Sequence, residues 1–223
     1  MQILAFDTAA AACSAALWRD GTVRARRLEP MARGQAEALL PMVRAVLDEA
    51  GAAFADLDLL AVTVGPGAFT GLRIGLAAAR GLALATGLPC LGVTTLEAVA
   101  QAVPAAARTG DAILAVLDTR RDDVYAQTFG NDLNPLDAPR AVDPAALDLP
   151  AGVRAPVAAG DGAALLPPAL AARAVEVAAI DAATVAELAA RRWRPGTPLT
   201  PPEPLYLRPP MATVPVAGGR LRP

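Results

Sequence analysis

Residues 2–28 read QILAFDTAAAACSAALWRDGTVRARRL, and this stretch decides the fold class. It contains three short segments with strand character, at residues 2–6, 13–18 and 23–28. Asp20-Gly21, between the second and third segments, is a strong hairpin signal because both residues tolerate positive φ. The N-terminus is therefore expected to form three consecutive strands joined by short turns.

Helix and strand patterns alternate after this opening. Apolar residues at helical spacing predict an amphipathic helix over residues 36–50, with Pro41 marking a kink or a start. An unbroken apolar run predicts a strand buried on both faces at residues 59–64. GPGAFTG then opens a helix that runs to about Thr86. A fifth strand at residues 90–93 and a short helix capped by Thr94-Thr95 complete the order βββαβαβα.

The second half of the chain echoes the first. Residues 112–117 form an apolar strand that ends at Asp118-Thr119, and residues 124–129 alternate like its hairpin partner, so a weak internal repeat is indicated. Later patterns predict three further features: a strand at residues 153–159, a helix at 181–193 and an extended segment at 203–208. The last dozen residues are expected to be disordered.

These patterns predict an α/β protein with two ribonuclease-H-like lobes, the second smaller and degenerate. The division is expected at residues 1–106 and 107–223. The alternative is an ordinary doubly wound fold. The opening three-strand meander argues against it, because doubly wound folds alternate strand and helix from the start.

Composition excludes several function classes. With 54% hydrophobic and 19% charged residues the chain is a folded globular protein. It contains no histidine, so imidazole cannot serve as base, nucleophile or metal ligand. A net charge of −2 is not typical of a protein that binds nucleic acid through charge alone. Two distant cysteines indicate no zinc site or disulfide scaffold. The start lacks a basic signal region and the longest apolar run is short for a membrane span, so a cytoplasmic protein without membrane attachment is expected.

The string GPGAFTGLRIG, residues 65–75, resembles the signature GPGSFTGLRIG of the TsaB family. Five other segments match that family in order: ILAFDTA with CSAALW, LLPMV, GVTTLEA, LDTRRDDVYA and EPLYLR. The resemblance covers nearly the whole chain and is weakest between residues 130 and 180.

This resemblance implies an actin-like ATPase fold, in the superfamily of actin, hexokinase and the heat-shock ATPases. It implies a subunit that does not catalyse transfer itself but dimerises with a catalytic paralogue, TsaD, in the synthesis of threonylcarbamoyladenosine in transfer RNA. TsaE, an ATPase, joins the assembly. The resemblance further implies a homodimer when the subunit is alone, contact with transfer RNA only through the complex, and ATP or ADP at the complex interface rather than on the isolated subunit.

Candidate nucleotide-binding residues occupy the superfamily's phosphate-loop positions. Asp7-Thr8 follows the first strand, and Asp118 is its counterpart in the second lobe. Gly160 and Gly162 fall where an adenosine-contacting turn would lie. Each position also has a purely structural interpretation. Asp7 caps the end of a strand, Asp118 lies in the turn between two hairpin strands, and Gly160 and Gly162 form an ordinary turn. Neither phosphate loop contains a glycine, and such loops approach phosphate poorly, so any nucleotide site is expected to be weak.

The helix after GPG carries the candidate partner interface. Glycines recur every fourth residue along one flank and leave a groove into which a second backbone could pack. The alternative is that these glycines pack tightly on the protein's own sheet. A phosphate-binding helix start is less fitting, because the P-loop Lys and Ser/Thr are absent. The predicted interface comprises Gly67, Phe69, Thr70, Gly71, Arg73 and Gly75 from this helix, and Leu39 and Val43 from the first helix.

Three functions compete on this evidence. The first is the scaffold that activates a catalytic paralogue. The second is a small-molecule kinase or ATPase of the same superfamily, which the glycine-free loops disfavour. The third is the metallopeptidase activity once ascribed to relatives, which needs a histidine pair that this chain does not possess. No catalytic residue and no metal ligand is therefore assigned.

Overall fold

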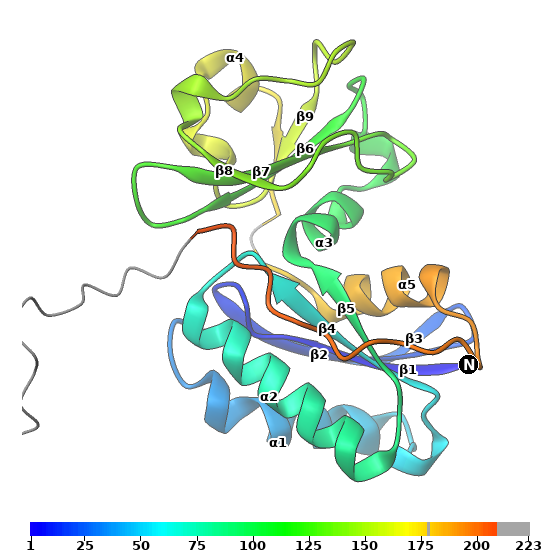
Figure 1. The fold of residues 1–223 in the computed structure, drawn as a ribbon. Coiled ribbons are helices and arrows are strands. Elements are labelled where there is room, and N and C mark those ends of the chain that lie inside the picture. Colours follow the sequence, from blue (N-terminus) through cyan, green and yellow to red (C-terminus); the bar gives the residue numbers. More distant parts are fainter. Residues whose placement is uncertain (178, 209–223) are drawn as a thin grey trace, which may run out of the picture.

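The computed structural model describes residues 1–177 and 179–208. The last dozen residues, for which disorder is predicted, lie outside this part. Two five-stranded sheets, each with helical segments against it, form the two lobes (Figure 1).

The first sheet has the strand order β3-β2-β1-β4-β5. Its opening meander is antiparallel, whereas β4 and β5 run parallel to β1. Asp20 and Gly21 turn the hairpin with φ of 47° and 89°, which confirms the predicted turn. The strands are β1 (Gln2–Asp7), β2 (Ala12–Arg19), β3 (Thr22–Pro30), β4 (Leu59–Gly65) and β5 (Cys90–Thr94).

Helices cover both faces of this sheet. On one face lie α1 (Gln35–Glu49), with Pro41 inside it, and α2 (Phe69–Thr86). On the other lies α3 (Thr95–Ala102), where the Thr94 side chain accepts from the Glu97 amide in a capping box, as the sequence predicts. A 3₁₀ turn (Phe54–Asp56) precedes β4, and another (Ala105–Ala107) follows α3.

The second sheet repeats the pattern in the order β10-β9-β6-β7-β8, with an antiparallel meander β6-β7-β8 and parallel β9 and β10. Its connections hold only short helical pieces, so the prediction of a smaller, degenerate second lobe is confirmed. The strand predicted at residues 153–159 is confined to β9 (Val157–Ala159). The remaining elements are β6 (Ile113–Asp118), β7 (Val124–Phe129), β8 (Arg140–Val142), η3 (Pro144–Ala146), η4 (Ala163–Leu165), α4 (Pro168–Ala171) and β10 (Ala174–Val175).

The helix α5 (Ala182–Arg192) returns from the second lobe to the first. It contacts all five strands of the first sheet and also α3. The Ser14 hydroxyl on β2 fixes its start, because Ser14 donates to the Ile180 carbonyl at 2.8 Å and accepts from the Ala182 amide at 3.0 Å. The division into residues 1–106 and 107–223 thus groups α5 with the second lobe, although α5 packs on the first sheet.

One apolar core joins the lobes. Residues of both sheets, including Ile3 and Ile113, belong to a single buried cluster with α3 and α5. Two separate clusters fill the outer faces, one beneath α1 and α2 and the other beneath η4. The lobes therefore share one packed core, and the ribbon shows α3 between the two sheets (Figure 1).

Candidate functional site

The carboxyl group at the end of β1 is sealed inside the first lobe. Asp7 is 0% exposed, and it accepts hydrogen bonds from the Thr63 hydroxyl on β4 and from the Ala9 amide. Its Oδ2 atom is buried without a hydrogen-bond partner among the described residues. Desolvation raises the pKa of Asp7 from its usual 3.8 to about 6, although these two hydrogen bonds act in the opposite direction.

Thr8 is also buried and links the β1–β2 loop to α2. Its hydroxyl donates to the Gly71 carbonyl at 2.7 Å. A nucleotide phosphate or its metal would need access to these two side chains, and the loop leaves neither accessible. The geometry favours the structural alternative for Asp7 and Thr8, and a nucleotide role for them stays a prediction.

The glycine flank of α2 receives this same loop. A Cβ at Gly67 would collide with the Ala9 carbonyl oxygen, and one at Gly71 with the Thr8 carbonyl oxygen; at Gly75 it would lie 2.7 Å from the Thr8 Oγ1 atom. The groove that the sequence predicts is present, but the chain's own backbone fills it. The prediction that a partner's backbone enters this groove is therefore wrong. The loop at Thr8 and Ala9 of the same chain already occupies the space beside these glycines.

The two interface residues predicted on α1 are core residues. Leu39 and Val43 are each 1% exposed in the cluster between α1, α2 and the first sheet. The outer face of this helix pair instead presents Leu40 and Leu84, exposed by 52% and 89%. Phe69, Thr70 and Arg73 do lie on the surface, so their assignment to an interface stays a prediction.

The second lobe brings its predicted nucleotide residues together. The turn at Gly160 and Gly162 lies against the end of β6, where a Cβ at Gly162 would lie 2.9 Å from the Asp118 amide nitrogen. Asp161, between these glycines, accepts from that amide at 2.9 Å. Arg120 then pairs with both Asp118 and Asp161 at 3.1 Å. An arginine thus neutralises the carboxylates that a nucleotide-bound metal would need, and these residues do not form an open metal-nucleotide site as they stand.

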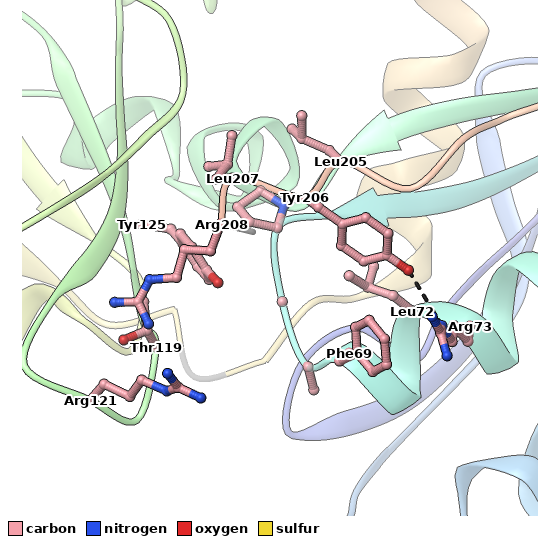
Figure 2. Close-up of a pocket in the computed structure, with 13 residues that line it drawn as sticks. Phe69, Leu72, Arg73, Thr119, Arg121, Tyr125, Leu205, Tyr206, Leu207 and Arg208 are labelled. Carbon is pink, nitrogen blue, oxygen red and sulfur yellow. Dashed lines mark hydrogen bonds between the residues drawn. The ribbon is translucent and has the colours of Figure 1, made fainter. Parts of the chain in front are cut away.

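A cavity of about 640 Å³ lies between the lobes, and sequence reasoning did not find it. From the first lobe it is lined by the start of α2, and from the second by Thr119, Arg121 and Tyr125. The segment Leu205 to Arg208 closes one side. Figure 2 shows the side chains of the two lobes on opposite sides of this space. The sequence signal was present in the run of arginines after Asp118 and in the C-terminal EPLYLR, but only the fold brings them together.

The C-terminal segment is attached to both lobes. The Leu205 amide donates to the Val64 carbonyl at 2.7 Å, and Arg80 donates to the Pro202 carbonyl at 2.8 Å. Arg208 forms an ion pair with Asp123 of the second lobe. The segment therefore lies along the first sheet and reaches across the cavity.

Aromatic and guanidinium groups are stacked at the first-lobe side of the cavity. The Arg73 guanidinium lies 3.8 Å from the Phe69 ring centroid, and the Tyr206 ring lies 5.5 Å from that of Phe69. Arg73 Nε also donates to the Tyr206 hydroxyl at 3.4 Å (Figure 2). Such stacking orients the arginine by cation–π attraction while leaving its remaining N–H groups for another acceptor.

Two lobes of one strand order, each opening with an Asp-Thr turn after its first strand, define a two-lobed α/β protein of the actin-like ATPase fold. The model of the TsaD family, described as tRNA N6-adenosine threonylcarbamoyltransferase, matches residues 29–190. The chain belongs to this family, and its relatives assign it to the TsaB/YeaZ group.

Relatives and solved structures support that assignment. The chain is 46% identical to the Escherichia coli (strain K12) tRNA threonylcarbamoyladenosine biosynthesis protein TsaB over 136 residues, which cover 60% of this chain and 57% of that protein. Identity to the Bacillus subtilis (strain 168) protein of the same name is 34% over 58% of this chain and 55% of that protein. The chain thus spans little more than half the length of these curated relatives. A solved structure of YeaZ from Pseudomonas aeruginosa is 31% identical, with a TM-score of 0.77 over 92% of this chain and 99% of that one.

Within residues 1–177 and 179–208, no helix has the length and apolarity needed to cross a membrane.

Proposed function

We propose that this chain is a non-catalytic subunit of the complex that makes N6-threonylcarbamoyladenosine in transfer RNA. In this proposal it dimerises with the catalytic paralogue TsaD, and the ATPase TsaE joins the assembly in the cytoplasm. Alone, the chain forms a homodimer. The chain contacts transfer RNA only as part of the assembled complex. ATP or ADP binds at the complex interface rather than to the isolated chain.

The single observation that carries the non-catalytic role is the sealed first phosphate loop. Asp7 is wholly buried, and Thr8 is bonded to α2. A kinase or ATPase of this fold needs that loop open to its nucleotide. The absence of histidine from the sequence supports the same conclusion for imidazole-dependent chemistry.

The exposed face of α1 and α2 supports a docking role. Leu40 and Leu84 are large apolar side chains exposed on this helix pair. Burying a leucine removes apolar area worth about 1.5–3 kcal/mol. A partner that covers this face would therefore gain much of its affinity from a few side chains.

Co-expression with TsaD tests this proposal. We expect the two chains to copurify, and to give modified adenosine from ATP, bicarbonate, threonine and transfer RNA only when TsaD is present. Leu84→Asp should weaken the complex tenfold or more, about 1.4 kcal/mol, because it puts a charge on the apolar surface that the partner is proposed to cover. Leu165→Asp is the matched control, since Leu165 is 47% exposed on the second lobe.

Three results decide between the candidate roles. Product formation by the isolated chain would contradict the non-catalytic role. Phosphoryl transfer to a small molecule would support the kinase alternative. Equal loss of the complex in both leucine variants would remove the α1–α2 face from the interface.

A further inference from the structure

We propose that the cavity between the lobes binds one nucleotide of single-stranded RNA, with its phosphate at Arg73 and Arg121 and its base on the ring of Tyr206. That the strand is RNA rests on the proposed function, in which transfer RNA reaches this cavity within the assembled complex and the isolated chain binds a single strand only weakly. The site itself rests on the geometry of the cavity, and neither the Asp7 nor the Asp118 carboxylate lines it.

The charge of the cavity is the first support. Arg73, Arg121 and Arg208 line it, whereas none of its lining residues in the described part of the chain is Asp or Glu. Asp123 offsets Arg208 through their ion pair. The chain as a whole has a net charge of −2, so the gathering of three arginines is a feature of the cavity and not of the overall composition. Guanidinium groups are the side chains best suited to a phosphate diester, which they can bind through two parallel hydrogen bonds.

Flat rings next to these guanidinium groups are the second support. Phe69 and Tyr206 are exposed by 49% and 44%, although such rings are usually covered in a folded monomer. They lie at the first-lobe side, while Tyr125 lines the opposite side. Aromatic rings that alternate with arginines are typical of surfaces that bind single-stranded nucleic acids. On such surfaces the bases stack on the rings and the phosphates bind the guanidinium groups.

The size of the cavity is the third support. Its volume of about 640 Å³ lies within the range of about 300–1,000 Å³ that small-molecule ligands occupy. That space suits a single nucleotide and excludes a duplex. RNA-binding proteins recognise unpaired nucleotides in this manner, with bases stacked on aromatic or arginine planes.

An acidic peptide fits less well. Its carboxylates would satisfy the arginines but would leave the exposed rings without a flat partner. Transfer RNA supplies both chemistries in one unit, and the names of the curated relatives already connect this family with transfer RNA.

Fluorescence anisotropy of a 5′-labelled hexa-adenylate with the purified full chain tests the proposal. At low salt we expect a dissociation constant of about 10–100 μM, the range of weak, largely electrostatic binding. Arg121→Gln and Arg73→Gln should each weaken binding at least fivefold and lower the salt slope by about one. Arg154→Gln is the matched control, because Arg154 is exposed on the second lobe and does not line the cavity.

Tyr206→Leu separates stacking from charge. It should weaken binding about tenfold and leave the salt slope unchanged, because it removes a ring and no cation. Thermal melting checks that each variant is folded. Copurification with TsaD is measured separately, so a failure of the cavity is distinguishable from a failure of the proposed function.

The outcomes are decisive. Loss of hexa-adenylate binding in the cavity variants but not in Arg154→Gln supports the site. Absence of binding, or equal binding by all variants, overturns it. Binding of adenosine monophosphate without binding of hexa-adenylate assigns the cavity to a free nucleotide and overturns the RNA proposal.

Discussion

The two lobes share a strand order, and each begins with an Asp-Thr turn, but the turns are closed in different ways. In the first lobe, backbone packing closes the turn, because Thr8 is bonded to Gly71 and α2 lies against the loop. In the second lobe a side chain closes it, because Arg120 pairs with Asp118 and Asp161. The first closure is buried, and the second is at the surface.

This difference implies that the two potential phosphate loops are not equally easy to open for a nucleotide. Opening the first loop would break a close fit between a helix and a strand end, where packing is dense and a shift is costly. Opening the second requires only that one arginine, whose side chain is 70% exposed, move into solvent. Three variants test this contrast, from the largest expected effect to the smallest.

Gly71→Ala should have the largest effect. A Cβ there collides with the Thr8 carbonyl oxygen, so the helix or the loop must move. We expect the free energy of unfolding to fall by about 3 kcal/mol, at the upper end of overpacking effects. Chemical denaturation measures it.

Gly81→Ala, in the same helix, is the matched control. A Cβ at Gly81 meets nothing within 4 Å, so the gain in helix propensity should raise stability by about 0.5–1 kcal/mol. If both variants unfold alike, α2 does not depend on a close fit to the β1–β2 loop.

Asp7→Asn should change how stability depends on pH. Because burial raises the pKa of Asp7 to about 6, the folded state holds its proton more tightly than the unfolded state does. The contribution of Asp7 to the free energy of unfolding of the wild type should therefore be most favourable below about pH 4. It should be lost as the pH rises through 6. The difference from the variant, which stays neutral, should reach about 3 kcal/mol above pH 7.

Urea unfolding of both proteins between pH 4 and 8 measures this difference. Asp118→Asn is the matched variant in the second lobe, where loss of a surface ion pair should change stability by less than about 1 kcal/mol. A constant gap between wild type and Asp7→Asn across this range would contradict the buried position of Asp7.

Arg120→Gly should have the smallest effect. Arg120 has a φ of 61°, which glycine adopts without strain, and the two ion pairs it loses are at the surface. Stability should change by less than about 1 kcal/mol. ATP should still bind no tighter than about 10 μM, because the first loop stays closed. Calorimetry that finds tight ATP binding in this variant would show that Arg120 alone blocks the site.

The sequence predicted the elements better than their packing. The hairpin at Asp20-Gly21, the cap at Thr94 and the helix after GPG are confirmed, because each depends on local backbone chemistry. The glycine spacing of α2 correctly indicated close approach of another backbone. It could not indicate whose backbone, since an internal loop and a partner helix make the same demand.

Positions that depend on distant contacts were predicted less well. Leu39 and Val43 have the helical spacing of a buried face, and only the fold shows that this face meets the sheet. The cavity escaped prediction because its residues come from three separate segments. Tyr206 and Arg121 line the same cavity only after the chain has crossed between the lobes twice.

The return of α5 to the first sheet has a consequence for synthesis on the ribosome. The strands β1 and β2 leave the exit tunnel early, but the helix that covers their inner face is encoded beyond residue 181. Until then the apolar side chains of β1 and β2 on that face lack this helix, and Ser14 lacks the groups it bonds at Ile180 and Ala182. The nascent chain must therefore carry an unfinished first lobe through translation of the second, which is the interval in which a chaperone or a partner subunit would find exposed apolar surface.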